Sequence, residues 1–196
     1  MRETYFLFPI SSISHFSFLI SPVFLHNHYE AAFEAYLRYN RIPYIGINER
    51  KRSLLGDGET LKSLDFIVTV PNGLSWFVDV KGRKFPGGTE HASYWKHWTT
   101  RDDLVSMQRW QTLFGNHYSG LFVFAYWICG PRSPLPEERL FEFRGELYGF
   151  VAVPWFEYLS EVRLLSPRWN TYGMSTRKFR ALARPFDELV GIPEKR

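Results

Sequence analysis

The sequence predicts an α/β domain built on a mixed β-sheet, and three patterns support this prediction. Residues 28–39 carry apolar side chains at helical spacing, whereas residues 64–70 and 74–81 follow one another as two strands joined by a turn. Residues 121–128 are apolar throughout, as in a central strand covered on both faces. A chain of 196 residues is long enough to bury a core of its own in one domain.

The N-terminal residues differ in composition from the rest of the chain. No Lys, Arg, Asp or Glu occurs between Thr4 and Tyr29, so we divide the chain into an apolar extension, residues 1–26, and a single domain, residues 27–191. An extra strand, a loose arm, an over-extended start and a membrane anchor are all compatible with the extension. Its two prolines and five serines disfavour the anchor, because a span needs about 20 predominantly apolar residues.

Charge and cysteine content narrow the classes of function. The chain has 24 basic and 20 acidic residues, a net charge of +4, so binding to a polyanion must rest on a local patch. Its single cysteine, Cys129, excludes an internal disulfide and a thiolate zinc cage. A reducing, cytoplasmic location is therefore expected.

The first helix is expected over residues 28–39, with Asn27 as its N-cap. Four apolar side chains would form its buried face: Tyr29, Phe33, Tyr36 and Leu37. A short apolar stretch, residues 44–47, precedes the two strands, which turn at residues 71–73.

The second helix is expected to begin at Thr100, which has capping-box spacing to Asp103, and to end before Gly115. Residues 139–143 and 146–153 predict a hairpin that turns at Arg144 and Gly145. Short helices are expected after Pro154 and over residues 175–182.

Two carboxylates are predicted to lie opposite one another on the paired strands. If the turn pairs Val70 with Leu74, the register places Asp65 directly across from Asp79, with Cβ atoms about 5 Å apart. Two like charges at that separation repel by about 3 kcal/mol at an effective dielectric of about 20. Because a cation between them would reverse this cost, the register indicates a metal site.

Lys81 lies two residues after Asp79 and therefore projects from the same face of its strand. An ammonium group there could orient a water molecule and stabilise charge that develops on a phosphate. The alternative is a plain ion pair between these two side chains, which would leave Asp65 unexplained. Hard oxygen donors, without thiolates or a histidine pair at i, i+4, favour Mg²⁺ or Mn²⁺ over Zn²⁺.

The first helix offers a further carboxylate at one of two positions. Glu30 borders the buried face and lies three residues after Asn27, so it could join the site or only complete a capping box. Glu34 lies further from that face and could pair with Arg38 at i, i+4. Helical geometry alone leaves both positions open.

Taken together, these motifs resemble the PD-(D/E)XK nuclease superfamily. The resemblance rests on Glu30 in the first helix, on Asp65 in Ser-Leu-Asp-Phe-Ile-Val, and on Asp79 and Lys81 in Phe-Val-Asp-Val-Lys-Gly-Arg. A Tyr-Leu pair six and seven residues after Glu30 is similar to the YraN-like and Holliday-junction-resolvase-like branch, which favours Glu30 over Glu34. The run His-Tyr-Glu-Ala-Ala-Phe-Glu at residues 28–34 is similar to the motif of the HYExAFE proteins.

The resemblance implies a restriction-endonuclease-like αβββαβ core, with a mixed β-sheet flanked by helices and a C-terminal hairpin and helices added. It also implies that Asp65, Asp79 and the Val80 carbonyl hold a divalent metal, with Glu30 bound directly or through water. Lys81 would position the attacking water. Leu64 stands where the pattern often has proline before this first Asp.

In several branches of the superfamily a glutamine of the second helix reaches the site. Gln108 and Gln111 are both available here, and we take Gln111 as a candidate catalytic residue. A solvated polar face is the alternative for either side chain.

Cations and rings close to the predicted site suit a phosphodiester substrate. Three cations are expected at one end of the strand pair: Lys62, Arg83 and Lys84. The loop at residues 84–98 mixes rings with charge, and its Lys96 and Trp98 could contact unpaired or distorted bases. Packing of the same rings across the sheet edge is the alternative.

The sequence thus predicts a divalent-metal-dependent phosphodiester hydrolase with nucleic acid, preferably DNA, as its partner and Mg²⁺ or Mn²⁺ as its cofactor. No small-molecule cofactor is expected, and the oligomeric state is left open. Two other classes remain. One is a non-catalytic nucleic-acid-binding module with the same fold, and the other is a membrane-associated protein that uses the N-terminal extension.

Overall fold

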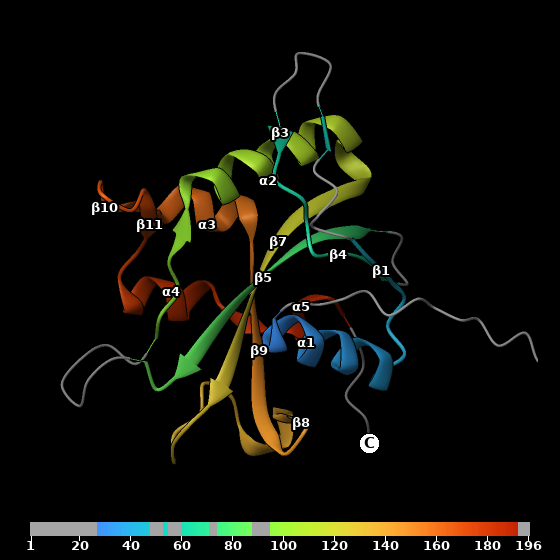
Figure 1. Ribbon diagram of the computed structural model, residues 1–196, viewed down its shortest axis with the longest axis vertical. Coiled ribbons are helices and arrows are strands. Elements are labelled where there is room, and N and C mark those ends of the chain that lie inside the picture. The colour runs from blue at the N-terminus through green and yellow to red at the C-terminus, as the bar shows by residue number, and fades with distance from the viewer. Residues whose placement is uncertain (1–26, 48–52, 55–59, 71–73, 88–94, 192–196) are drawn as a thin grey trace, which may run out of the picture.

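The computed structural model describes residues 27–47, 53–54, 60–70, 74–87 and 95–191. These residues form an α/β architecture in which a mixed sheet lies between helices (Figure 1). The predicted fold class is thereby confirmed. The N-terminal extension and the turn at residues 71–73 lie outside the described residues. Within the described part of the chain, no helix has the length and apolar character that crossing a bilayer requires.

The central sheet has seven strands. Along the sheet these are β1 (Tyr44–Gly46), β4 (Phe66–Thr69), β5 (Ser75–Phe85), β7 (Tyr118–Ile128), β9 (Glu146–Pro154) and β12 (Arg184–Pro185), with β8 (Phe141–Phe143) also paired to β9. Among the strand pairs of the described residues, only β5 and β7 are parallel, and their pairing is continuous from Ser75 opposite Tyr118 to Phe85 opposite Ile128. Helix α2 (Arg101–Phe114) lies in the connection between these two strands, as parallel neighbours require.

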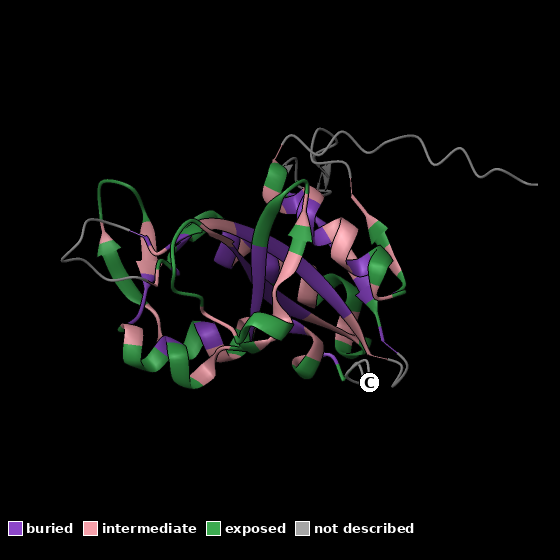
Figure 2. Cartoon of the chain, turned by 90° about the horizontal axis from the view of Figure 1, so that it is seen from below, coloured by how far each residue is buried: buried purple, intermediate pink, exposed green. Residues whose placement is uncertain are grey.

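Helices cover both faces of this sheet, and each covered face has its own apolar core (Figures 1 and 2). Helix α1 (His28–Tyr39) buries Phe33 and Leu37 against the even positions of β5, such as Val78. Helix α2 buries Leu104 and Met107 on the opposite face, where the odd position Phe77 lies. The alternation of β5 therefore assigns its side chains to two different layers.

The remaining elements are short. The helices are α3 (Trp155–Glu161), α4 (Thr176–Leu182) and α5 (Phe186–Leu189), with 3-10 turns at Gly115–His117 and Glu137–Arg139. A three-stranded sheet joins β10 (Arg163–Ser166), β11 (Thr171–Gly173) and β6 (Thr99–Thr100), and β2 (Ser53–Leu54) pairs with β3 (Thr60–Leu61).

One close approach locks α1 onto β5. A Cβ atom built on Gly82 would lie 2.1 Å from a ring carbon of Tyr29, so no larger residue fits there without displacing the ring. The neighbouring His28 bonds the Tyr148 hydroxyl through Nδ1 at 2.8 Å. The beginning of α1 is thus fixed against two strands of the sheet.

Most predicted elements lie where the sequence placed them. Helix α1 has the predicted limits and the Asn27 cap, and α2 has the predicted capping box between Thr100 and Asp103. The hairpin turns at Arg144 and Gly145, both with positive φ, at 55° and 78°. The sequence did not predict the sheet of β6, β10 and β11, because its strands have only two to four residues.

Candidate active site

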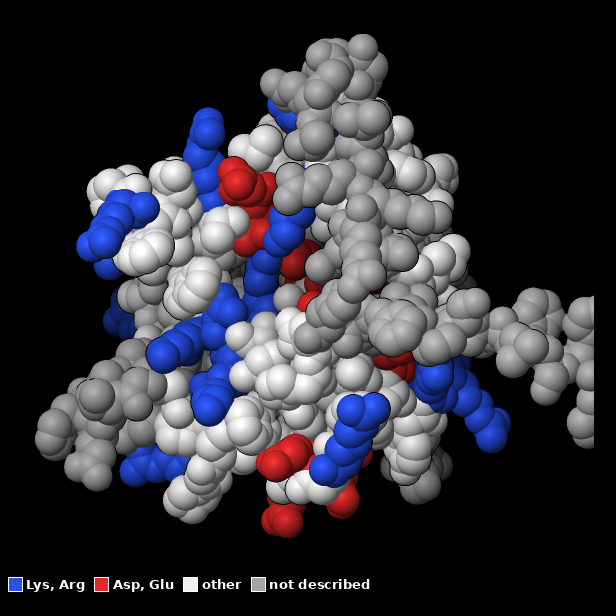
Figure 3. All heavy atoms as spheres, in the orientation of Figure 1, with Lys and Arg blue, Asp and Glu red and all other residues white. Residues whose placement is uncertain are grey.

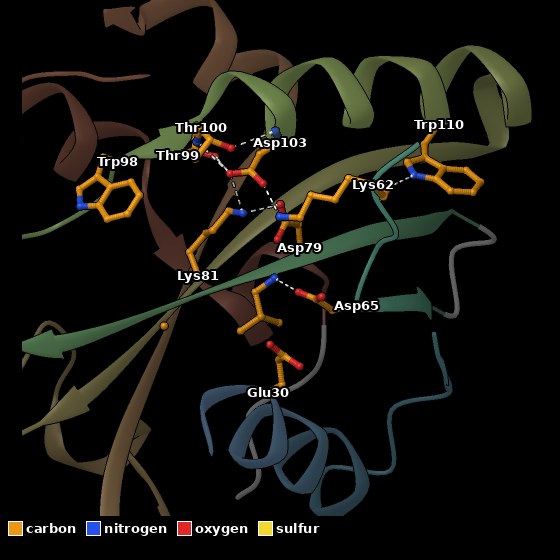
Figure 4. Close-up of polar contacts among 12 residues, drawn as sticks. Glu30, Lys62, Asp65, Asp79, Lys81, Trp98, Thr99, Thr100, Asp103 and Trp110 are labelled. Atoms are coloured by element: carbon orange, nitrogen blue, oxygen red, sulfur yellow. Dashed lines mark hydrogen bonds and ion pairs between the residues drawn. The ribbon is translucent and has the colours of Figure 1, made fainter. Parts of the chain in front are cut away.

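A buried ion-pair chain lies between β5 and α2. Asp79 and Lys81 project from β5 on the α2 side, and Lys81 Nζ lies 2.6 Å from Asp79 Oδ2 and 2.9 Å from Asp103 Oδ2 (Figure 4). The exposed fractions of these residues are 6% for Asp79, 8% for Lys81 and 4% for Asp103. The ion pair that the sequence left as an alternative for Asp79 and Lys81 is therefore present, and a second carboxylate shares it.

The position of Asp103 follows from the start of α2. It is the third residue of the helix, and its Oδ2 accepts from Thr99 Oγ1 and from the backbone amide of Thr100, both at 2.8 Å. In return its own amide donates to Thr100 Oγ1 at 3.2 Å. The capping box thus fixes the carboxylate in front of Lys81.

Lys62 is the last member of the ion-pair chain and pairs with Asp103. Its ammonium group is paired with Asp103 Oδ1, and its backbone carbonyl accepts from Trp110 Nε1 at 2.9 Å. The Lys62 side chain is 43% exposed, in contrast to the buried Lys81. The partly exposed Lys62 and the buried Lys81 are therefore paired with the same carboxylate, that of Asp103.

The electrostatic effects within this cluster are strong. Burial alone would raise the pKa of Asp103, but Lys81 and Lys62, together with the hydrogen bonds from Lys62 and Thr100, hold its pKa well below the usual range. Burial opposes the charge of Lys62, yet the carboxylates of Asp79, Asp103 and Asp65 raise its pKa above the usual value. Asp103 therefore stays ionised at neutral pH.

Asp65 precedes β4 in the register that the sequence predicted. The ladder pairs Phe66 with Val78, and the Asp65 amide donates to the Val78 carbonyl at 3.0 Å. The Asp65 carboxylate, 4% exposed, accepts from the backbone amide of Val80 at 2.5 Å. The two aspartates thus come from β5 and from the residue just before β4, and each carboxylate has a separate partner on β5.

Of the two glutamates on α1, Glu30 lies on the side of the site. It is 7% exposed, accepts from Asn27 Nδ2 at 2.9 Å through Oε1, and points toward Asp65 (Figure 4). Glu34 instead forms the predicted pair with Arg38 at 2.6 Å and accepts from the Tyr44 hydroxyl at 2.6 Å. The structure therefore separates the roles of these two residues.

The donors gathered here have the chemistry of a hard-cation site. Asp65, Asp79, Glu30 and the Val80 backbone lie around one segment of β5 (Figure 4) and offer oxygen atoms, which suit Mg²⁺ or Mn²⁺. Within the described residues, however, no three His, Cys, Asp or Glu side chains are already arranged around a common point that a metal ion could occupy. The oxygen donors are of the type that Mg²⁺ or Mn²⁺ prefers, but in this structure the Asp79 carboxylate is paired with Lys81.

Gln111 lies further along α2 than the ion-pair chain. It lies eight residues after Asp103, about 12 Å further along α2. Its Nε2 donates to the carbonyls of Gly115 and Tyr118 at 3.2 and 2.5 Å, and its Oε1 accepts from the Gly120 amide at 3.1 Å. In this structure the Gln111 amide secures the connection from α2 to β7, and the assignment of Gln111 as a catalytic residue stays a prediction. Gln108 is exposed.

Basic side chains gather on the same face as the carboxylates. Lys and Arg form a diagonal band below α2, beside a cluster of acidic side chains (Figure 3). Arg83 lies over the Trp98 ring at 4.2 Å and donates to the Trp98 carbonyl at 2.5 Å, while Lys84 lies over Trp127 at 4.8 Å. Lys96 is exposed, and Trp98 is 41% exposed.

The aromatic loop divides into a packed part and an exposed part. Trp95 contacts the rings of Phe85, Tyr126 and Phe179, and His97 stacks on Phe179 at 4.3 Å. The packing alternative therefore applies to these two residues, whereas Lys96 and Trp98 remain exposed. Residues 88–94 of the loop lie outside the described residues.

Comparison with known proteins supports the fold. Neither a protein-family model nor a curated protein matches the chain. Among solved structures, it is similar to a Holliday junction resolvase, Hjc, from Archaeoglobus fulgidus, with a TM-score of 0.50. The chain has the restriction-endonuclease-like fold. The match covers 86% of this chain and 97% of the resolvase, at 12% sequence identity.

Sequence reasoning missed Asp103 as a site residue. Its capping-box spacing to Thr100 was visible, but the ion pairs to Lys62 and Lys81 depend on how α2 docks on β5. One signal was present in the sequence. Asp103 is the second of two adjacent aspartates in the first turn of α2, and one capping carboxylate would have sufficed there.

Proposed function

We propose that this chain is a divalent-metal-dependent phosphodiester hydrolase that acts on DNA and belongs with the HYExAFE proteins among the PD-(D/E)XK nucleases. The observation that carries the proposal is Lys81, buried and held between two carboxylates on the central strand of a resolvase-like fold. A buried lysine with two acidic partners is a costly arrangement for stability alone. Its pairing with Asp79, a candidate metal ligand, gives it a chemical use.

Lys81 is the residue assigned to the reacting phosphate. Its ammonium group has three N–H donors, of which Asp79 and Asp103 occupy two. The third would donate to a phosphate oxygen or to the attacking water. Asp103 acts as a positioning residue, because it fixes the ammonium through a carboxylate that Thr99 and Thr100 hold in place.

Mg²⁺ or Mn²⁺ would be held by Asp65, Asp79 and the Val80 carbonyl, with Glu30 direct or through water. When bound, the ion would polarise a phosphate oxygen and lower the cost of the negative charge that develops there. Asp65 already binds the Val80 amide, which keeps its carboxylate beside β5. The cations Lys62, Arg83, Lys84 and Lys96 would contact flanking phosphates, and Trp98 would stack on a base.

Single-turnover cleavage of labelled DNA under saturating Mg²⁺ tests the proposal. The substrates are a four-way junction, a forked duplex and a blunt duplex. Lys81→Ala should lower the cleavage rate at least about a hundredfold while changing DNA affinity little, and Lys81→Arg should recover only part of the rate.

Arg144→Ala is the matched control, because it removes a cation from the hairpin turn between β8 and β9. Its cleavage rate should equal that of the native chain. A Lys81→Ala variant that cleaves at the native rate would remove the catalytic assignment.

A non-catalytic nucleic-acid-binding module is the second candidate. It is favoured by the direct pairing of Asp79 with Lys81, which satisfies the carboxylate without any metal. Calorimetry with Mg²⁺ separates the two. The nuclease requires binding that Asp79→Asn weakens, whereas the module predicts DNA binding that is independent of both the ion and Asp79.

A further inference from the structure

The β10–β11 hairpin is attached directly to the candidate active site. Strand β11 pairs with β6, with Tyr172 opposite Thr99 and Thr171 opposite Thr100, and the Arg101 amide donates to the Asn170 carbonyl at 2.9 Å. Thr99 and Thr100 are the residues that hold Asp103. The hairpin therefore begins one strand away from the ion-pair chain, beside the start of α2 (Figure 1).

This part of the chain is strongly basic. Between Arg163 and Phe186 the sequence has six Lys or Arg residues and no Asp or Glu, while the whole chain has a net charge of only +4. Two of the six pair with carboxylates of α3, since Lys178 pairs with Glu161 and Arg184 with Glu157. Among the described residues, no ion pair involves Arg163, Arg168 or Arg177.

The hairpin tip presents an uncovered ring together with a cation. Trp169 is 67% exposed, the largest exposed fraction among the large apolar side chains that the structure describes, and the Arg168 guanidinium lies 5.1 Å from its ring. The base of the hairpin repeats the arrangement. There Arg83 lies over the ring of Trp98. Trp98 adjoins β11, because a Cβ built on Gly173 would lie 3.7 Å from the Trp98 Cα.

Exposed rings of this kind are suited to stacking on bases, which have an apolar face whatever their sequence. Arginines that flank the rings can contact phosphates and stack as well. Stacking needs a base that is not already enclosed between two neighbours, so a continuous duplex offers no partner to a ring at a hairpin tip.

We propose that the β10–β11 hairpin is a second nucleic-acid-binding element, which uses Trp169 to stack on an unpaired or unstacked base and Arg168 to contact the adjacent phosphate. The inference rests on the proposed function and specifies its substrate class, which is DNA with a branch or a single-stranded arm. Because β11 is hydrogen-bonded to β6, a base held at the hairpin would fix the distance of the neighbouring backbone from Lys81.

Binding measured without cleavage tests the inference. The full chain is titrated in EDTA against two fluorescent DNAs, a forked duplex with unpaired arms and a blunt duplex of the same length, and anisotropy is recorded. Trp169→Ala should weaken binding of the forked DNA about tenfold and leave the blunt duplex within about twofold. Arg168→Ala should weaken binding of both and reduce the salt dependence by about one phosphate contact.

Two control variants match these changes elsewhere on the surface. Tyr39→Ala removes a ring that is 64% exposed on α1, and Arg144→Ala removes an arginine that lies over the Phe143 ring at 4.9 Å. Both should bind the forked DNA as the native chain does. Thermal unfolding of all four variants verifies that each one is folded.

The outcomes are distinguishable. Native affinity of Trp169→Ala for the forked DNA, or an equal loss for both DNAs, overturns the stacking role and leaves the nuclease proposal standing if the native chain cleaves DNA. A change in oligomeric state instead of DNA affinity assigns the hairpin to a protein interface and also overturns the inference. A native chain that binds neither DNA overturns both proposals.

Discussion

The two faces of strand β5 are almost equally buried but carry opposite chemistry. Toward α1 the strand presents Val78 and Val80 to an apolar core cluster, whereas toward α2 it presents Asp79 and Lys81. The apolar face gains free energy whatever the pH or ionic strength, because it depends on burial. The charged face depends on protonation and on bound ions, so it can respond to a ligand. One strand therefore serves both stability and chemistry.

The largest effect is expected on the apolar face. Phe33 is fully buried, with its ring centroid 4.9 Å from that of Phe186 and 5.2 Å from that of Phe150. Phe33→Ala should lower the free energy of unfolding by about 3–5 kcal/mol, because it leaves a cavity among these rings. Urea denaturation measures the loss. A loss below about 1 kcal/mol would mean that α1 is not essential to the core.

The next effect belongs to the charged face and concerns activity. Asp79→Asn keeps the shape of the side chain but removes the charge that faces Lys81 and a metal. Cleavage should fall at least about a hundredfold, equivalent to about 2.7 kcal/mol in the barrier. Its cost in metal-free stability should stay below that of Phe33→Ala. Glu142→Gln, on the short strand β8, serves as the control, and retention of native Mg²⁺ affinity by Asp79→Asn would contradict the metal assignment.

Asp103→Asn sharpens the comparison through its pH dependence. The substitution should cost about 1–3 kcal/mol at pH 7, since a buried charged hydrogen-bond partner of Lys81 and Lys62 is lost. The pKa of Asp103 is lower in the folded protein than in the unfolded chain, where it is about 3.9. The ionised carboxylate therefore adds its full amount to the free energy of unfolding above about pH 3.9, and this amount is lost as the pH falls toward the pKa of the folded state. Unfolding at pH 7, 5 and 3 should show a constant difference between the variant and the native chain down to pH 5 and a smaller one at pH 3. A difference that grows below pH 4 would contradict this sign.

The smallest effect is expected at the surface pair on α1. Glu34 bonds Arg38, whose side chain is 56% exposed, so Glu34→Gln should change stability by no more than about 0.5 kcal/mol. The cleavage rate and the Mg²⁺ affinity of Glu34→Gln should remain at native values.

Glu30→Gln, on the same helix, should instead lower the affinity for Mg²⁺. Equal behaviour of the two variants in calorimetry would remove Glu30 from the site.

The sequence was sufficient for features that depend on local patterns. The limits of α1, the register that pairs Phe66 with Val78 and the face shared by Asp79 and Lys81 all follow from helical spacing and strand alternation. It also separated Glu30 from Glu34, although only through a resemblance.

Features that depend on docking could not be predicted. Asp103 meets Lys81 because α2 lies across β5, and no spacing in the sequence encodes that contact. The hydrogen bonds between the Gln111 amide and the backbone after α2 depend on docking in the same way. The β10–β11 hairpin escaped notice because its strands are too short for alternation to appear.

The hydrogen bond from the Val80 amide to Asp65 makes this amide a built-in spectroscopic probe. Val80 lies two residues beyond the last β4 pair of β5, is 6% exposed and pairs with Val123 of β7, so exchange of its amide proton with solvent should be slow. Its ¹⁵N and ¹H chemical shifts will depend on the charge and position of one carboxylate, to which the proton points at an N to O distance of 2.5 Å. A titration followed at this single resonance would report events at Asp65 directly, without a substrate and without an attached reporter group, because uniform ¹⁵N labelling leaves the chemistry of the site unchanged.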